Sequence, residues 1–243
     1  MKELPLALAE MRNIHKWYGK VHAVDGVSLT INNGEIVGLL GDNGAGKTTL
    51  IKVLSGYHRP DDGEIFIEGE KVRINSPSEA NALGIETVYQ EQALVDSMSV
   101  ARNFYMGREP VKRAGFLDKQ KMNECMIPLR TLGLSIKSPD ILVRNLSGGE
   151  KQGAAIARAM YFKAKLVILD EPTRALAVRE VSRILDFVKG LKEANIAVIF
   201  ITHTLHHVHS VADRFAIMNK GKIVKDIKRD EASLEELTEV LMD

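Results

Sequence analysis

Short apolar runs, separated by turn residues and by helical patterns, are the clearest feature of this chain. The nearly all-apolar run 36–40 is typical of a central strand that is buried on both faces. Further strands are expected at 27–31, 64–68, 85–89, 166–169 and 196–201. Helices are expected at 48–54, 148–162, 178–194 and 231–242, and Ser76-Pro77 favours another helix start. Alternating strands and helices predict an α/β fold with a mainly parallel sheet and helices outside it.

The pattern changes between about residues 93 and 161, where strand signals disappear and helical segments dominate. These segments are interrupted at Gly107, Pro110, Gly115, Pro128 and Pro139. We therefore predict a helical subdomain at 93–161, inserted into an α/β core formed by 1–92 and 162–243. Together they make a single domain of 243 residues, a size compatible with one large α/β domain.

Bulk composition narrows the classes of function. The formal net charge is +1, from 33 Lys and Arg against 32 Asp and Glu, so no excess of charge indicates binding to nucleic acid or to a membrane surface. The single cysteine, Cys125, permits no intrachain disulfide and favours a reducing compartment. No apolar run approaches about 18 residues and the N-terminus lacks a secretory signal, so we expect any membrane association to depend on a partner.

A phosphate-binding loop follows the apolar run 36–40 and precedes a predicted helix. Its residues are Gly41, Asp42, Asn43, Gly44, Ala45, Gly46, Lys47, Thr48 and Thr49. Glycines let backbone N–H groups turn toward phosphate oxygens, and the helix N-terminus adds partial positive charge. We expect Lys47 to reach the β- and γ-phosphates and the Thr48 hydroxyl to ligate Mg²⁺. A glycine-rich turn with a chance lysine is the alternative, which the fixed spacing and the strand–loop–helix context disfavour.

Two carboxylates end the apolar run 166–169. The carboxyl end of a strand beside a phosphate-binding loop is where Mg²⁺ is held, so Asp170 is suited to bind it, through water. Glu171 is placed to polarise an attacking water, a role typically worth about 10²–10⁴ in rate. The alternative, that both residues merely cap a strand, is weak beside a phosphate-binding loop.

A second anion-binding element is expected about 100 residues after the first. Ser147 can cap the helix that begins near Gly148, and its hydroxyl and the N–H groups of Gly148 and Gly149 would face an anion at the positive helix end. Glu150 completes the motif Leu146-Ser147-Gly148-Gly149-Glu150-Lys151-Gln152. In isolation this segment could be an ordinary capped helix.

With these motifs in this order, the sequence resembles the ATP-binding cassette (ABC) ATPase family over essentially all of its length. The further matching motifs are a glutamine loop at Tyr89-Gln90-Glu91, a D-loop at Arg174 to Ala177, a switch histidine at His203 and an adenine-stacking aromatic at Tyr18. Trp17, beside Tyr18, keeps the choice of stacking residue open. The resemblance implies an antiparallel N-terminal β part, ATP and Mg²⁺ as cofactors, and Gln90 near Mg²⁺ and the attacking water.

The resemblance also implies an assembly that spacing alone does not show. Two subunits face each other head to tail, and each ATP lies between the phosphate-binding loop of one and Ser147 and Gly149 of the other. ATP closes the dimer and hydrolysis reopens it. Whether two copies of this chain pair, as we expect, or this chain pairs with a different cassette is left open.

Several segments resemble the monosaccharide-importer branch of the family, among them Tyr89 to Glu91, Val100 to Pro110 and Gly115 to Asp118. This implies an ATPase subunit on the cytoplasmic face of the membrane, held there by a permease that it contacts near Gln90 to Pro110, and linked only indirectly to a sugar-binding protein. An amphipathic surface helix is the alternative for that segment. The extent of the chain, about that of a bare cassette, favours an importer subunit, although it also permits a separately encoded exporter ATPase. The rival classes are a translation or DNA-repair cassette, a silent nucleotide-binding regulator and an importer ATPase for another solute.

Two positions in the D-loop depart from the family pattern. The last D-loop position is Ala177 where Asp is common, and Arg174 stands where a small residue is usual, so we expect Arg174 to touch the opposite subunit.

Four histidines lie close together near the end of the chain. The positions of His203, His206, His207 and His209 could suggest a metal site, but no glutamate follows His203 as a zinc-protease helix requires. We expect His203 to sense the γ-phosphate and the other three to lie on a solvated or packed helix.

Overall fold

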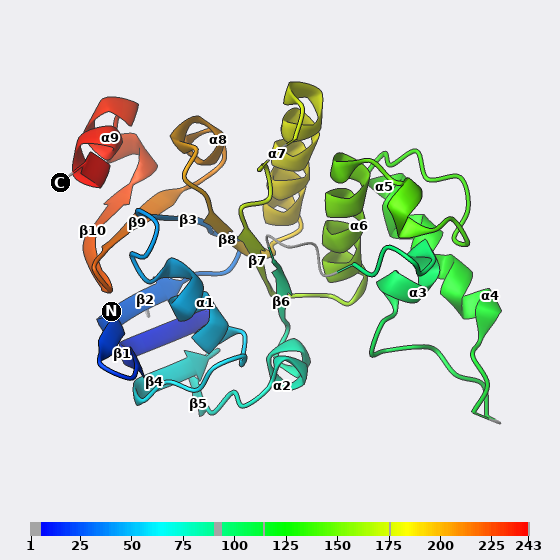
Figure 1. Cartoon of the computed structure of the whole chain (residues 1–243), viewed down its shortest axis with the longest axis horizontal. Coiled ribbons are helices and arrows are strands. Elements are labelled where there is room, and N and C mark those ends of the chain that lie inside the picture. The colour runs from blue at the N-terminus through cyan, green and yellow to red at the C-terminus, as the bar shows by residue number, and fades with distance from the viewer. Residues whose placement is uncertain (1–5, 90–93, 114, 175, 243) are drawn as a thin grey trace.

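The computed structural model describes residues 6–89, 94–113, 115–174 and 176–242, which form two β-sheets and a group of helices (Figure 1). The smaller sheet is antiparallel, with the strand order β2-β1-β4-β5. Its strands are β1 (Ala9–Tyr18), β2 (Val21–Ile31), β4 (Asp62–Ile67) and β5 (Glu70–Val72). This sheet is the antiparallel N-terminal part that the family resemblance implied.

The larger sheet has the strand order β10-β9-β3-β8-β7-β6. Its strands are β3 (Ile36–Leu40), β6 (Ile85–Val88), β7 (Leu166–Asp170), β8 (Ala197–Ile201), β9 (Arg214–Asn219) and β10 (Lys222–Lys228). Neighbouring strands are parallel except at the β9–β10 hairpin. Every residue of β3, β7 and β8 is buried, as expected of apolar strands covered on both faces.

Alternate side chains of these buried strands enter two different cores. Val37 and Leu39 of β3 face the antiparallel sheet and helix α1 (Lys47–Leu54), which lies between the two sheets (Figure 1). Ile36 and Leu40 face the opposite side, where α7 (Val178–Glu193), α8 (Leu205–His209) and α9 (Leu234–Met242) pack. This period of two places the end of β3, and the loop that follows it, between both layers.

The segment between β6 and β7 is helical and has a core of its own. It contains α3 (Val100–Phe104), α4 (Lys119–Met122), α5 (Met126–Thr131) and α6 (Gly148–Tyr161), with 3₁₀ turns at Asn123–Cys125 and Val143–Asn145. Phe104, Leu129 and Ala157 belong to one buried cluster with Cys125, whose thiol pKa burial raises to about 12. A buried thiol with a raised pKa is unreactive, so Cys125 is a packing residue of this core. Figure 1 places this helical part beside β6, on the side away from β10.

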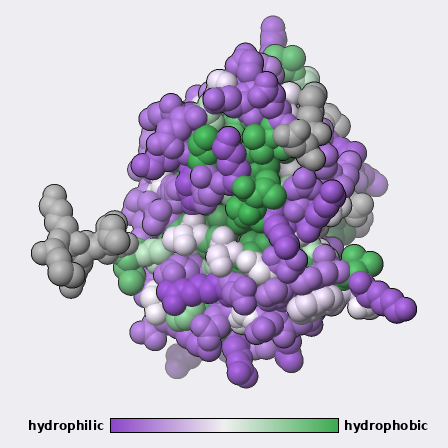
Figure 2. Space-filling model, turned by 90° about the vertical axis from the view of Figure 1, so that its left-hand side faces the viewer, coloured by the Kyte–Doolittle hydropathy of each residue, from purple (hydrophilic) through white to green (hydrophobic). Residues whose placement is uncertain are grey.

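The remaining elements are short. Ser76 caps α2 (Pro77–Ala82) by accepting a hydrogen bond from the N–H of Glu79, as the sequence predicted, and a 3₁₀ turn spans Arg229–Glu231. Within the described ranges, no helix combines the length and the apolar character needed to cross a membrane. Figure 2, which views the side of the molecule where β10 and α9 lie in Figure 1, shows a mostly hydrophilic face with a strip of hydrophobic residues near its middle.

Candidate functional site

The loop Gly41–Thr49 joins the end of β3 to the first turn of α1. Gly41 and Gly46 adopt φ values of 142° and 101°. A Cβ atom would lie 2.3 Å from the carbonyl oxygen of Met218 at Gly41, and 2.4 Å from that of Ala23 at Gly46. Only glycine fits these two positions, so the sequence fixes a loop whose backbone can turn toward a ligand.

Lys47 is the first residue of α1 and folds back over this loop. Its Nζ donates hydrogen bonds to the carbonyl oxygens of Gly41, at 2.6 Å, and Asp42, at 2.9 Å. Burial lowers the pKa of the ammonium group, while the nearby charges of Glu171 and Asp170 oppose that shift. The ammonium group thus lies at the mouth of the loop, and its hydrogen-bond partners among the described residues are neutral carbonyl groups that a charged ligand can replace.

The loop borders an open hollow. Its lining comes from the end of β1, the start of β2, the loop itself and the β9–β10 turn: Tyr18, Val21, His22, Ala23, residues 43–49, Lys220 and Gly221. Tyr18 is 43% exposed and belongs to this lining. Trp17 is absent from the described lining and stacks on His22 instead, with ring centroids 4.1 Å apart. Of the two aromatic candidates, Tyr18 is therefore the one that faces the loop.

Two adjacent carboxylates end β7 in different environments. Asp170 is buried, and its burial, followed by the charge of Glu171, raises the pKa of its carboxyl group. Glu171 follows with φ at +51°, a left-handed conformation that is uncommon outside glycine and is often found at functional sites. Asp170 therefore continues the direction of β7, whereas the backbone turns at Glu171.

The Glu171 side chain is held by residues after β8. Its Oε1 accepts hydrogen bonds from the backbone N–H of His203, at 3.1 Å, and lies 2.8 Å from His203 Nδ1, while Oε2 accepts from the Thr202 hydroxyl at 3.2 Å. Thr202 is fully buried. Parallel pairing of β7 with β8 aligns Asp170 with Ile201 and so brings the two strand ends together. This clamp joins the predicted base and the predicted switch histidine in one hydrogen-bonded group.

The segment Ser147 to Glu150 forms the start of α6. The Ser147 hydroxyl accepts from the N–H of Glu150 at 3.2 Å, and the Glu150 carboxylate accepts from the N–H of Ser147 at 2.9 Å, forming a capping box. Ser147 is exposed, and α6 packs against α7, α5 and α3. Figure 1 shows α6 on the far side of β7 and β6 from α1, so within one chain this motif and the phosphate-binding loop lie apart.

Glu180 of α7 joins this motif to the D-loop, a link that sequence reasoning missed. Its carboxylate accepts hydrogen bonds from the backbone N–H groups of Gly149, at 3.1 Å, and Ala177, at 3.2 Å. These bonds lower the pKa of its carboxyl group. In the D-loop, the side chain of Arg174 is exposed and its N–H donates to the Glu171 carbonyl oxygen at 3.2 Å. The only signal in the sequence was the position of Glu180 three residues into a predicted helix.

The remaining predictions concern the glutamine loop and the three histidines that follow His203. Gln90 and Glu91 of the predicted glutamine loop lie outside the described residues. His206, His207 and His209 lie on α8, as expected: His206 is exposed, His207 Nδ1 is 3.0 Å from the Thr173 hydroxyl, and His209 Nε2 is 3.2 Å from the carbonyl oxygen of Ala232.

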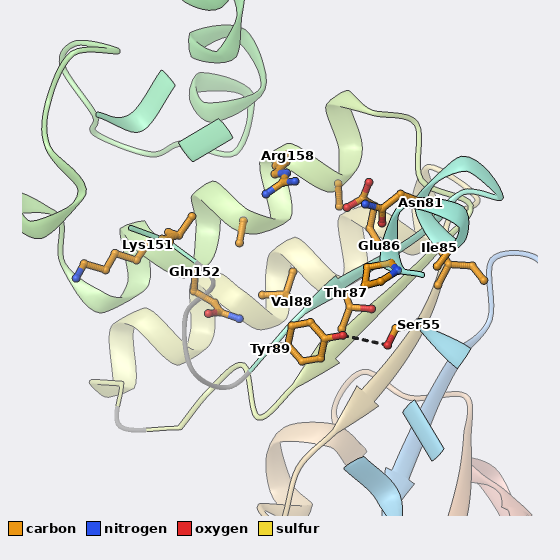
Figure 3. Close-up of a pocket in the computed structure, with 15 residues that line it drawn as sticks. Ser55, Asn81, Ile85, Glu86, Thr87, Val88, Tyr89, Lys151, Gln152 and Arg158 are labelled. Carbon is orange, nitrogen blue, oxygen red and sulfur yellow. Dashed lines mark hydrogen bonds between the residues drawn. The ribbon is translucent and has the colours of Figure 1, made fainter. Parts of the chain in front are cut away.

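A pocket lies between the α/β core and the helical part, and Tyr89, the described residue of the predicted glutamine loop, belongs to its lining (Figure 3). Ile85 to Tyr89 line one side, and Lys151, Gln152 and Arg158 of α6 line the other. The hydroxyl groups of Tyr89 and Ser55 lie 3.0 Å apart across its floor. An ion pair between Arg108 and Glu86, at 2.5 Å, connects the core to the helical part nearby. Along β6 the pocket thus combines apolar Ile85 and Val88 with polar Glu86 and Thr87, and along α6 it carries cationic side chains.

Comparison with known proteins agrees with this geometry. Residues 24–174 match the sequence family described as ABC transporter. The chain is 48% identical to the xylose/arabinose import ATP-binding protein XylG of Sulfolobus acidocaldarius, over 96% of this chain and 93% of that protein. It is 41% identical to the ribose import ATP-binding protein RbsA 1 of Rubrobacter xylanophilus, over 97% of this chain but 47% of that protein, so it spans about half of that relative.

A solved structure agrees as well. A nucleotide-free ATP-binding cassette from an ABC transporter superimposes with a TM-score of 0.84 at 28% identity, over 98% of this chain and 96% of that one. Fold and site together define a nucleotide-binding cassette ATPase. The chain belongs to the ABC transporter family, which confirms the resemblance and the fold class drawn from the sequence.

Proposed function

We propose that this chain is the ATP-hydrolysing subunit of an importer that takes up a monosaccharide through a separate permease. The observation that carries the ATPase assignment is the clamp on Glu171 at the end of β7, next to the phosphate-binding loop. The sugar assignment is supported by relatives named for import of xylose and arabinose, of ribose and, at 41% identity, of fructose. All of these relatives are named for the import of a monosaccharide, which favours a sugar over other solutes.

ATP binding is assigned to the hollow beside the loop Gly41–Thr49. The N–H groups of the loop and of the first turn of α1 donate hydrogen bonds to the phosphates, and Lys47 exchanges its two carbonyl partners for β- and γ-phosphate oxygens. Tyr18 stacks on the adenine ring, an interaction worth about 1–3 kcal/mol in comparable base contacts. Glu171 then accepts a proton from the attacking water, and His203, hydrogen-bonded to it, keeps that carboxylate oriented and contacts the γ-phosphate.

Mg²⁺ fits the donor set at this edge of the sheet. Asp170 is a buried carboxylate beside the carboxylate of Glu171, and the two negative charges repel each other. A divalent cation bound there would offset this repulsion. Asp170, the Thr48 hydroxyl and the predicted Gln90 would hold the ion with phosphate oxygens. When bound, Mg²⁺ neutralises charge on the transferring phosphoryl group.

The complete site is proposed to form between two copies of this chain. The exposed Ser147 and the N–H groups of Gly148 and Gly149 stand at the positive end of a helix of 14 residues, and nothing in the described part of the chain brings a phosphate site to them. A second copy packed head to tail presents its bound ATP there. The exposed Arg174 lies in the D-loop, where it is suited to touch the opposite subunit.

The permease is proposed to dock on the pocket of Figure 3 and on the segment from Gln90 to Pro110, so that the chain lies on the inner face of the cell membrane. An amphipathic helix with an acidic residue fits Ile85 and Val88 of β6 beside Lys151 of α6, whose ammonium group pairs with Asp96 in the free chain. The sugar-binding protein acts on the other side of the membrane and touches this chain only through the permease.

Affinity purification of the tagged chain from native membranes tests this proposal. We expect a permease to co-purify, and the complex to show ATPase activity that a monosaccharide and its binding protein stimulate. Lys151→Glu, which reverses a charge in the pocket, is expected to reduce the recovered permease at least about tenfold, since like charges across an interface cost several kcal/mol. Lys189→Glu, a matched change at an exposed position of α7, is expected to leave recovery unchanged. Co-purification with ribosomes, or stimulation by a solute other than a sugar, would contradict the proposal.

A further inference from the structure

Two histidines and an aspartate converge on the hairpin formed by β1 and β2. His15 Nδ1 lies 3.1 Å from His22 Nε2, and Asp25 Oδ1 lies 3.7 Å from His15 Nδ1 and 3.5 Å from His22 Nδ1. All three side chains are half-buried, and their potential ligand atoms lie within 4.8 Å of one another. Among the described residues this is the one group of three or more histidine, cysteine or acidic side chains that lie this close together.

Irregular pairing of the two strands produces this convergence. Ile14 pairs with Val27 and Lys16 pairs with Val24, so His15 alone stands opposite both Asp25 and Gly26. A second irregularity follows, because Lys16 pairs with Val24 of β2 while the next residue, Trp17, pairs with His22. In a regular strand, side chains three positions apart, such as those of His22 and Asp25, would point to opposite faces. The bulges bring them to the same face as His15, which is how bulges re-aim side chains at functional sites.

The surroundings hold these groups in place. The rings of His15 and His22 are almost parallel, at 17°, and Trp17 stacks on both of them. Lys222 of β10 contacts Asp25 Oδ2 at 3.1 Å, which leaves Oδ1 directed toward the histidines. Ring nitrogens and a carboxylate oxygen therefore meet at a half-buried point, with their orientation fixed by neighbours, as ligands of a metal require.

We propose that His15, His22 and Asp25 bind one divalent cation of the zinc class, with water completing the coordination. Four ligands placed about 2.0–2.1 Å from Zn²⁺ in a tetrahedron lie about 3.3–3.4 Å apart. His15 Nδ1 lies 3.1 Å from His22 Nε2 and 3.7 Å from Asp25 Oδ1, so small adjustments let one ion join Nδ1 of His15, one ring nitrogen of His22 and Oδ1 of Asp25. Neutral imidazole together with one carboxylate suits Zn²⁺, Ni²⁺ or Co²⁺ better than Mg²⁺, which prefers oxygen ligands.

This cation would brace the hairpin that carries the proposed adenine contact. His22 and Tyr18 both line the hollow beside the phosphate-binding loop. The backbone N–H of Asp25 donates to the carbonyl oxygen of Gly221, and the N–H of Gly221 donates to that of Ala45 in the loop. A metal that joins β1 to β2 at this point therefore fixes one wall of the hollow relative to the loop.

Titration of the metal-stripped full chain with Zn²⁺, in the absence of nucleotide, tests the proposal. Calorimetry is expected to show one equivalent bound, and Co²⁺ is expected to give the visible absorption of a four- or five-coordinate site. Loss of one ligand in His22→Asn, or in the isosteric Asp25→Asn, should weaken Zn²⁺ binding by at least about 100-fold, more than the loss of an outer-shell partner costs.

His206→Asn, at an exposed histidine on α8, is the matched control and should retain the bound equivalent. Circular dichroism establishes that each variant is folded, and His15→Gln replaces His22→Asn if the latter is not. Absence of Zn²⁺ binding at 100 µM, unchanged binding in both the His22 and Asp25 variants, or loss of binding in His206→Asn would each overturn the proposal. All these readouts are independent of ATP hydrolysis and of the permease.

Discussion

Glu171→Gln is expected to keep ATP binding while it lowers ATP turnover by about 10²–10⁴-fold. The amide preserves the size of the side chain and still accepts a hydrogen bond from the N–H of His203, but it accepts no proton from water. Steady-state release of phosphate measures the loss, and calorimetric titration with ATP measures the retained affinity. Because ATP closes the proposed dimer and hydrolysis reopens it, size-exclusion chromatography in ATP should show this variant accumulating as a dimer.

The matched control for this experiment is Glu193→Gln, which makes the same chemical change at an exposed position at the end of α7. Its ATPase rate should equal that of the unmodified chain. An ATPase rate in Glu171→Gln that is also unchanged would refute the assignment of Glu171 as the general base. Loss of ATP binding in that variant would instead show that the clamp of Thr202 and His203 builds the binding site itself.

Lys47→Ala is expected to weaken ATP binding by about 2–5 kcal/mol, which corresponds to a rise of about 30-fold or more in Kd. Within the described residues, the ammonium group of the nucleotide-free chain donates hydrogen bonds to the carbonyl oxygens of Gly41 and Asp42, and its charge favours ionisation of the buried Asp170. Its removal leaves no side chain without a hydrogen-bond partner, so the affinity for ATP should fall by more than the stability of the folded state. Calorimetric titration with ATP and a thermal melt of the same sample measure the two effects.

Lys119→Ala, at an exposed position of α4, removes the same charge away from the hollow and should leave ATP affinity unchanged. Equal affinities of Lys47→Ala and the unmodified chain for ATP would contradict the placement of phosphate in this loop. Both variants lose one positive charge, but only Lys47 faces the charges of Glu171 and Asp170. The comparison therefore separates the effect of net charge on ATP affinity from the effect of the Lys47 ammonium group.

The buried strands and long helices were predictable because their apolar patterns are local. The run 36–40 coincides with β3, and the expected helices at 48–54 and 148–162 agree with α1 and α6 to within one residue at each end. The α/β class, the parallel sheet and the antiparallel N-terminal part are confirmed. The boundaries proposed for the helical subdomain at 93–161 remain a prediction.

The elements that were missed have patterns blurred by irregular pairing or by short length. β1 reads without clear alternation because bulges interrupt its pairing with β2 between Met11 and Trp17. β5 has three residues, too few for a period to be recognised. The β9–β10 hairpin alternates only in β10, where every second residue is exposed, while β9 is buried through its centre.

Within the candidate site, the sequence identified residue types but not the contacts between them. Asp170 and Glu171 were predicted from the end of a strand, whereas the left-handed turn at Glu171 and its hydrogen bond with Thr202 depend on β8, some 31 residues later. Likewise, Glu180 meets Gly149 only because α6 and α7 pack together. Such contacts follow from tertiary packing, which no local pattern records.

Disulfide cross-linking between two different chains tests the central claim most directly, namely that ATP is bound between the phosphate-binding loop of one subunit and Ser147 of another. One chain carries Asn43→Cys and the other Ser147→Cys, both exposed positions, each combined with Cys125→Ser and Glu171→Gln. The account predicts a covalent dimer that forms only when the two chains are mixed and only with ATP and Mg²⁺ present. A covalent dimer that forms equally without ATP, or no covalent dimer while ATP remains bound, would contradict it.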